Sequence, residues 1–147
     1  FGDAIESVTR ANALAAKQHG HTLTYTPPES LPLIVGDRSR LEQVMMNVIG
    51  NAIKYGAEGK RILVKVMADT DTVQVSVTNY GYVIPAEELP LLFDRFHKAD
   101  KARSADREGW GLGLYIAKTI VGAHGGEIWA TSENGVTEFC FTLPVVR

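Results

Sequence analysis

Cysteine is nearly absent from this sequence, since Cys140 is the single one among 147 residues. A single cysteine excludes an intrachain disulfide, and sparse cysteine is typical of proteins in a reducing compartment. The sequence also lacks the run of about 18 apolar residues that a membrane-spanning helix requires. Together these absences predict that this stretch of chain lies in the cytoplasm.

An excess of charge of either sign is missing as well. The chain carries 15 basic and 17 acidic residues, a formal net charge of -2. Because a nucleic-acid surface needs a strong basic excess, we expect no nucleic-acid partner. Hydrophobic residues make up 45% of the chain, which is enough for one core, so we expect a single domain over residues 1–147. The chain begins at Phe1 rather than methionine, so we expect a fragment of a longer protein.

Hydrophobic periodicity divides the chain into helices and strands. Helical spacing predicts helices over residues 3–18, between Asp37 and Gly56, near 86–93 and over 112–123. Apolar runs and alternation predict strands over residues 23–25, 33–35, 61–68, 72–78, 127–132 and 137–143, the last two joined at Asn134-Gly135. This mixed order predicts an α+β fold, a two-layer α/β sandwich in which about three helices cover a mixed, mostly antiparallel sheet of about five strands.

Two of the predicted helices have a defined apolar face. The helix after Asp37 is expected to bury Leu41, Val44, Met45, Val48 and Ala52. The helix over 112–123 is expected to bury Leu112, Tyr115, Ile116, Thr119 and Ile120. Residues 97–110 are charged and lack apolar periodicity, so we expect them to form a mobile loop.

A polar stripe runs along the helix that follows Asp37. Asn47, Asn51 and Lys54 lie at positions i, i+4 and i+7, so they share one face, separate from the apolar face. An amide oxygen is a suitable Mg²⁺ ligand, and a lysine ammonium neutralises phosphate charge. The alternative is a solvated polar face. Asparagine is unfavourable inside a helix, and this cost favours a functional interpretation.

Two further segments fit a nucleotide. Gly109-Trp-Gly111-Leu-Gly113-Leu114 opens a helix, where exposed backbone N–H groups suit an anion, although a tight helix entry would explain the glycines equally well. Asn79 follows a predicted strand and offers an amide that complements an adenine edge. A strand-ending turn is the alternative interpretation for Asn79.

Taken together, these segments resemble the ATP-binding catalytic domain of sensor histidine kinases, a branch of the ATPase superfamily shared with gyrase, Hsp90 and MutL. The segment from Asp37 to Tyr55 is similar to the N box of the family. Leu92-Phe-Asp-Arg-Phe96 is similar to its F box, and Gly109 to Leu114 to its second glycine box. His124-Gly-Gly-Glu-Ile-Trp129 and Thr137-Glu-Phe139 resemble its closing strands.

The resemblance implies a protein-histidine kinase that uses ATP and Mg²⁺. By this likeness Asn47, Asn51 and Lys54 are catalytic, and Asn51 is the metal ligand. Residues 97–110 would form a lid over ATP. The nucleotide-binding residues that the likeness implies, beyond these three, are Tyr55, Asn79, Gly81, Val83, Ile84, Phe96, Lys101, Arg103, Arg107, Gly109, Gly111, Leu112, Gly113, Leu114 and Thr137.

The resemblance also implies partners. The phosphoacceptor histidine would lie on the protein's own dimerisation domain, and a response regulator would act downstream. We expect the full-length protein to be a homodimer and the isolated domain to be a monomer. The domain would be the cytoplasmic part of a two-component sensor kinase.

The chain departs from the family where an Asp-x-Gly-x-Gly motif is usual. Asn79 replaces the aspartate, and Val83 brings a Cβ to a position where glycine would allow a positive φ. These changes favour an alternative, a degenerate pseudokinase-type domain with weak or no nucleotide binding that signals through domain contacts. A third alternative is a gyrase-like protein or an anti-sigma-factor kinase, against which the N box and F box segments favour the histidine-kinase branch.

Overall fold

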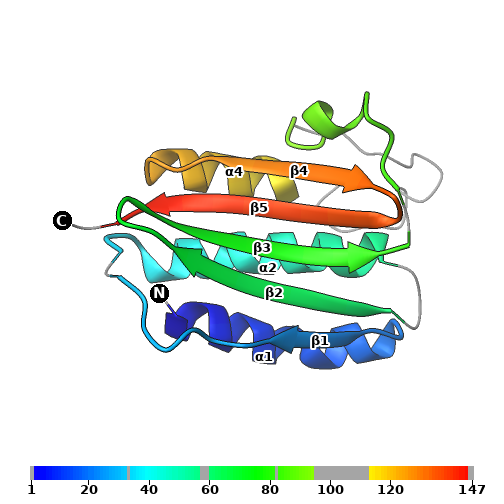
Figure 1. Ribbon diagram of the computed structural model, residues 1–147, viewed down its shortest axis with the longest axis horizontal. Helices are drawn as coiled ribbons and strands as arrows, with labels where there is room; N and C mark the ends of the chain where they lie inside the picture. The colour runs from blue at the N-terminus through cyan, green and yellow to red at the C-terminus, as the bar shows by residue number, and fades with distance from the viewer. Residues whose placement is uncertain (1, 33, 57–59, 82, 95–112, 146–147) are drawn as a thin grey trace.

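The computed structural model describes residues 2–32, 34–56, 60–81, 83–94 and 113–145, and it has the layered α+β fold that the sequence predicts. One layer is a five-stranded sheet, and the other consists of the helices behind it (Figure 1). The elements in chain order are α1 (Gly2–Gln18), β1 (Thr22–Tyr25), α2 (Arg38–Tyr55), β2 (Arg61–Ala68), β3 (Thr72–Tyr80), the 3₁₀ helix η1 (Leu89–Leu91), α4 (Gly113–Ala123), β4 (Ile128–Glu133) and β5 (Val136–Pro144).

The strands are ordered β1-β2-β3-β5-β4 across the sheet. β1 runs parallel to β2, and every other neighbouring pair is antiparallel. Val73, Val75 and Val77 of β3 are fully buried and lie on the face that the helices cover. The predicted alternation of β3 is therefore confirmed, and the core lies between this face and the α-helices α1, α2 and α4 that the structure describes.

Helix α2 forms where its sequence predicts. The side chain of Asp37 accepts a hydrogen bond from the Arg40 N–H at 3.2 Å, which caps the first turn. All five residues of the predicted apolar face are buried, and the C-cap is Gly56. Because the apolar face is fixed against the sheet, the opposite polar stripe has a fixed direction as well.

The β4–β5 hairpin also forms as predicted. Its turn is Asn134-Gly135, with φ of 54° and 78°, which is the left-handed conformation that both residues tolerate. The two strands pair Ser132 with Thr137 and Glu133 with Val136. This register becomes important at the candidate site.

The strand predicted over residues 33–35 is wrong. Ile34 and Val35 are not in a strand, and Val35 is 77% exposed; Leu33 lies outside the described residues. The segment pairs with none of the five strands of the sheet. The short helix predicted near 86–93 is present as the 3₁₀ helix η1, in which Pro90 supplies no N–H.

The buried face of α4 differs from the predicted one. Leu114, Ala117, Ile120 and Val121 are buried, whereas Tyr115 is 37% exposed and Thr119 is exposed. Ile116 is partly buried against the core, and Leu112 lies outside the described residues. Ala117 faces inward, where its small side chain allows close packing between α4 and its neighbours.

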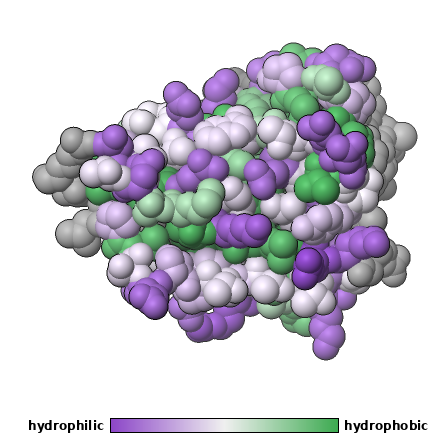
Figure 2. All heavy atoms as spheres, viewed as in Figure 1, coloured by the Kyte–Doolittle hydropathy of each residue, from purple (hydrophilic) through white to green (hydrophobic). Residues whose placement is uncertain are grey.

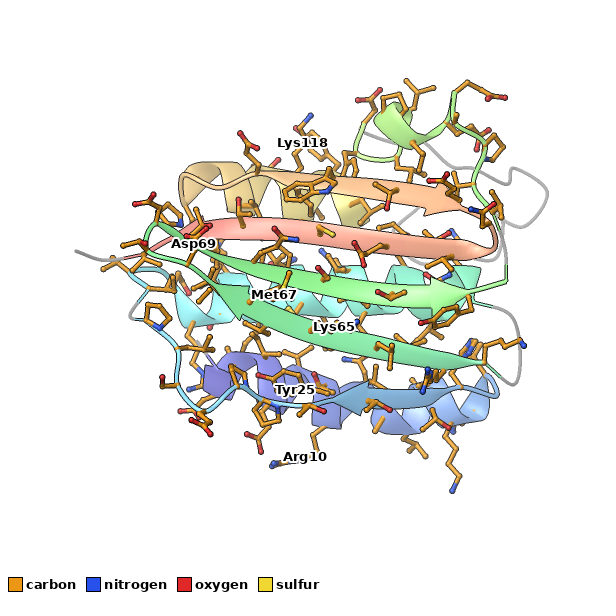
Figure 3. The ribbon with its side chains drawn as sticks, in the orientation of Figure 1. Arg10, Tyr25, Lys65, Met67, Asp69 and Lys118 are labelled. Carbon is orange, nitrogen blue, oxygen red and sulfur yellow. The ribbon has the colours of Figure 1, made fainter. Side chains whose placement is uncertain are left out.

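The face of the sheet that carries no helix is mixed in character. Lys65 and Met67 of β2 project from it (Figure 3), and Met67 is 58% exposed. Polar and apolar residues are interspersed over this side of the molecule (Figure 2). Among the helices that the structure describes, none is long and apolar enough to span a membrane.

Candidate functional site

The end of β3, the second half of α2 and the start of α4 meet at one end of the domain (Figure 1). Gly56, at the end of α2, forms an isolated bridge with Gly81, just after β3. The side-chain amide of Asn47 donates to the Gly113 carbonyl at 3.0 Å, which ties α2 to the first residue of α4. The structure therefore brings together segments that are far apart in the sequence.

The predicted polar stripe is present on α2. Asn47, Asn51 and Lys54 are all half-buried. The Asn51 amide donates to the Asn47 carbonyl at 2.9 Å. That hydrogen bond fixes the amide nitrogen and leaves the Asn51 oxygen available as a ligand.

Asn79 is the most unusual polar side chain of the site. It is fully buried, and neither its amide nitrogen nor its amide oxygen has a hydrogen-bond partner among the described residues. It pairs with Thr137 across β3 and β5, on the same face as the buried valines of β3. Buried amides are almost always hydrogen-bonded, so Asn79 is a candidate for contact with a ligand.

A network of hydroxyl groups fixes the backbone that follows β3. The Ile84 N–H donates to the Ser132 hydroxyl at 2.8 Å, and this hydroxyl lies 2.7 Å from that of Thr137. The Gly81 N–H donates to the Gly135 carbonyl at 2.7 Å. The segment after Asn79 is therefore fastened to the β4–β5 hairpin at two points.

Sequence reasoning missed Ser132 in this network. The signal was nevertheless present in the sequence, because Ser132 and Thr137 lie symmetrically about the Asn134-Gly135 turn. Counting outward from a two-residue hairpin turn pairs these two positions.

Val83 does not take a positive φ, since Asn134 is the only non-glycine residue with positive φ among the described residues. The side chain of Val83 is 44% exposed. Gly81 carries the left-handed conformation instead, with φ of 115°. Ile84 is buried and 1% exposed.

The start of α4 completes the described part of the site. A Cβ on Gly113 would lie 3.7 Å from the amide nitrogen of Asn51 and 3.9 Å from the nearest Asn47 atoms, so Gly113 lies directly beside the polar stripe. Leu114 is buried in the core. The predicted residues Phe96, Lys101, Arg103, Arg107, Gly109, Gly111 and Leu112 and the predicted lid, 97–110, lie outside the described residues, as does the side chain of Tyr55.

His124 secures the other end of the helix pair. Its Nδ1 lies 2.8 Å from the Ile120 carbonyl, and its Nε2 accepts a hydrogen bond from the Asp37 N–H at 3.2 Å. One ring nitrogen therefore donates and the other accepts, as in a neutral imidazole. This tie joins the end of α4 to the N-terminus of α2.

A cavity of about 330 Å³ lies near the start of α1, toward the opposite end of the domain from the C-terminal end of β3 (Figure 1). It is lined by residues at the start of α1 and in the segment after β1, among them Glu6, Tyr25, Pro28 and Leu31. It contains none of the predicted site residues. Within the described part of the chain, no group of three or more His, Cys, Asp or Glu side chains could hold a metal ion.

Residues 36–147 match the family model described as histidine kinase-, DNA gyrase B- and HSP90-like ATPase. The chain belongs to this family. The sensor histidine kinase WalK of Bacillus subtilis is 39% identical over 134 residues, which cover 89% of this chain and 22% of WalK. The chain therefore spans about a fifth of this relative, which is much longer.

Solved structures of the ATPase family share the fold. Full-length ShkA in complex with AMPPNP superposes with a TM-score of 0.84 at 26% identity, covering 99% of this chain and 30% of ShkA. The histidine kinase ThkA in complex with the response regulator protein TrrA gives a TM-score of 0.81 at 26% identity, covering 99% of this chain and 40% of ThkA.

Membership of the ATPase family confirms the predicted resemblance. The relatives are sensor histidine kinases, so the chain falls in the histidine-kinase branch rather than with gyrase-like proteins. They give no support to the alternative of a degenerate pseudokinase-type domain.

Proposed function

We propose that this domain binds Mg²⁺-ATP and presents it for phosphorylation of a histidine on a separate dimerisation domain. The observation that carries the proposal is the buried amide of Asn79, which has no partner among the described residues. Such an amide costs about 1–3 kcal/mol when it stays unpaired. A nucleobase edge, with a donor and an acceptor side by side, would satisfy both of its atoms.

The chemistry of the α2 stripe supports the phosphate end of the proposed site. Asn51 would contribute its amide oxygen to Mg²⁺, which prefers oxygen ligands and takes few of them from protein. Lys54 would place its ammonium group near the phosphates, and the N–H groups at the start of α4 would face them. Bound Mg²⁺ supplies positive charge that offsets the negative charge of the phosphate oxygens.

The remaining predicted residues would act from the lid. Lys101, Arg103 and Arg107 would neutralise charge that develops during transfer, and closure over residues 97–110 would exclude water. Tyr55, Gly81, Ile84 and Thr137 would line the nucleotide pocket. We propose these roles from the family resemblance together with the positions of the described residues nearby.

Partners are proposed from the relatives. The ShkA structure contains AMPPNP, and the ThkA structure contains a response regulator protein. By analogy, the complete protein would transfer the γ-phosphoryl group of ATP to its own dimerisation domain and then to a response regulator. Of the histidines in this chain, His21 and His124 are tied to backbone carbonyl oxygens, which suits structural roles.

Phosphorylation of the full-length protein tests the proposal. With γ-labelled ATP and Mg²⁺ we expect acid-labile, base-stable label on the dimerisation domain, as phosphohistidine gives. Asn51→Ala should reduce the initial rate at least about tenfold, as loss of a metal-site group typically does. Asn12→Ala is the matched control because Asn12 makes the same i−4 bond, to the Val8 carbonyl, on α1. No label in folded wild-type protein would contradict the proposal.

A further inference from the structure

His21 lies outside the candidate site but contacts the helix that carries it. It is 5% exposed and occupies the position just before β1. Its Nδ1 lies 3.0 Å from the Lys60 carbonyl oxygen, and its Nε2 lies 3.2 Å from the Ile53 carbonyl oxygen. Both ring nitrogens therefore face hydrogen-bond acceptors.

Either tautomer of the His21 ring directs an N–H at one of these two carbonyl oxygens. Ile53 lies in the last turn of α2, where the carbonyl groups need partners from outside the helix. The ring is therefore placed to hold the end of α2 or the segment before β2.

The other described histidines bind differently. His124 contacts one carbonyl oxygen and one backbone N–H, an arrangement that a neutral ring satisfies. His19 is exposed, and its Nδ1 lies 2.9 Å from the Ala15 carbonyl oxygen. Among the described histidines, the pair of carbonyl partners is therefore particular to His21.

The ring joins three segments at the nucleotide end of the domain. Ile53 lies between Asn51 and Lys54 on α2, and Lys60 immediately precedes β2. A Cβ on Gly56 would lie 2.9 Å from Cε1 of the ring, so the ring also packs against the residue that bridges to Gly81. His21 thus sits beside the junction that holds α2 against the end of β3.

We propose that His21 is a positioning residue: its ring ties the last turn of α2 to the segment before β2, and it thereby fixes the side chains of Asn51 and Lys54.

The ring itself tests the first half of the proposal without any nucleotide. In ¹H–¹⁵N spectra of the domain, a ring N–H of His21 should be visible and slow to exchange with water, because the ring is buried against carbonyl oxygens. A ring N–H of the exposed His19 should exchange rapidly. A His21 ring N–H that exchanges as fast as that of His19 would overturn the proposal.

Amide exchange tests the positioning itself. The Gly56 N–H donates to the Ala52 carbonyl at 2.9 Å in the last turn of α2. In His21→Leu its protection against exchange should fall at least tenfold, whereas His19→Leu, the matched control, should leave it unchanged. His21→Gln keeps a side-chain donor, so it should retain part of this protection. Equal protection of the Gly56 N–H in wild type and His21→Leu would show that the ring does not hold the last turn of α2.

The link to nucleotide rests on the proposed function, so it is measured separately. The Mg²⁺-ATP dissociation constant should rise several-fold in His21→Leu and be partly restored in His21→Gln. An unchanged dissociation constant together with faster exchange of the Gly56 N–H would overturn the positioning role. It would still show that His21 holds the last turn of α2. If wild type binds no nucleotide, the proposed function fails. The ring and exchange measurements still decide whether His21 holds α2 to the segment before β2.

Discussion

At Asn79, stability and the proposed function favour different side chains. Its amide is fully buried and without a partner among the described residues, which is costly for folding. The usual aspartate of the family would bury a charge at this position, whereas asparagine offers both a donor and an acceptor. The replacement of the family's aspartate by Asn79 is therefore chemically compatible with a purine edge.

Replacing this amide with an apolar side chain should separate the two effects. We expect Asn79→Leu to raise the free energy of unfolding by about 1–3 kcal/mol, because an unsatisfied buried amide is removed. The same change should weaken ATP binding at least tenfold. Chemical denaturation and calorimetry measure the two quantities. Thr78→Val is the control, since Thr78 lies on the other face and donates to Glu138 at 3.3 Å. Lower stability with unchanged ATP affinity would contradict this role.

Cys140 is a second residue whose surroundings set its chemistry. The thiol is 1% exposed and donates to a carboxylate oxygen of Glu138 at 3.3 Å. Burial raises the pKa of Cys140 to about 11, against a hydrogen bond from Ser76 that lowers it. A thiol in these surroundings stays protonated and unreactive at neutral pH.

The raised pKa of Cys140 predicts a loss of stability in alkali. The unfolded thiol ionises near its ordinary pKa of 9.0, while the folded thiol remains neutral up to about 11. Stability is therefore fully present below pH 9 and decreases as pH rises toward 11, by about 1.4 kcal/mol per pH unit at most. Urea unfolding of wild type and Cys140→Ala from pH 8 to 11 measures this. Parallel pH profiles for the two proteins would contradict it.

At the scale of elements, α2 is where sequence reasoning works best. Its cap, apolar face and end are all local features of the sequence, so its bounds and its polar stripe could be predicted. Strand 33–35 and the buried face of α4 could not, because both depend on neighbours distant in sequence. Ile34 and Val35 have no strand to pair with, and α4 turns Ala117 rather than Tyr115 inward.

Gly50 in α2 and Gly126 between α4 and β4 should respond oppositely to alanine. Gly50 lies on α2 with nothing within 4 Å of the position of a Cβ, so Gly50→Ala should stabilise the domain by about 0.5–1 kcal/mol. At Gly126 a Cβ would lie 1.8 Å from the Thr142 carbonyl oxygen. Gly126→Ala should therefore destabilise by at least about 2 kcal/mol, since the backbone must move. Thermal unfolding checks both, and equal effects would refute the packing described around Gly126.

At the scale of the whole molecule, the candidate site exists only through topology. Asn51, Asn79 and Gly113 come together because β3 ends beside the end of α2 and α4 begins against Asn47. The residue types and motifs could be recognised in the sequence. The strand order, the Ser132–Thr137 network and the tie of His21 to Ile53 and Lys60 could not, because each depends on long-range register.

Calorimetric titration of the domain with ATP, with and without Mg²⁺, tests the central claim most directly. We expect one saturable site whose affinity depends on Mg²⁺, because Asn51 offers a metal ligand and Asn79 offers an unpaired amide to the base. Asn51→Ala should lose the Mg²⁺ dependence. The absence of binding up to about millimolar nucleotide, in protein shown to be folded, would contradict the claim that this end of the sheet is an ATP site.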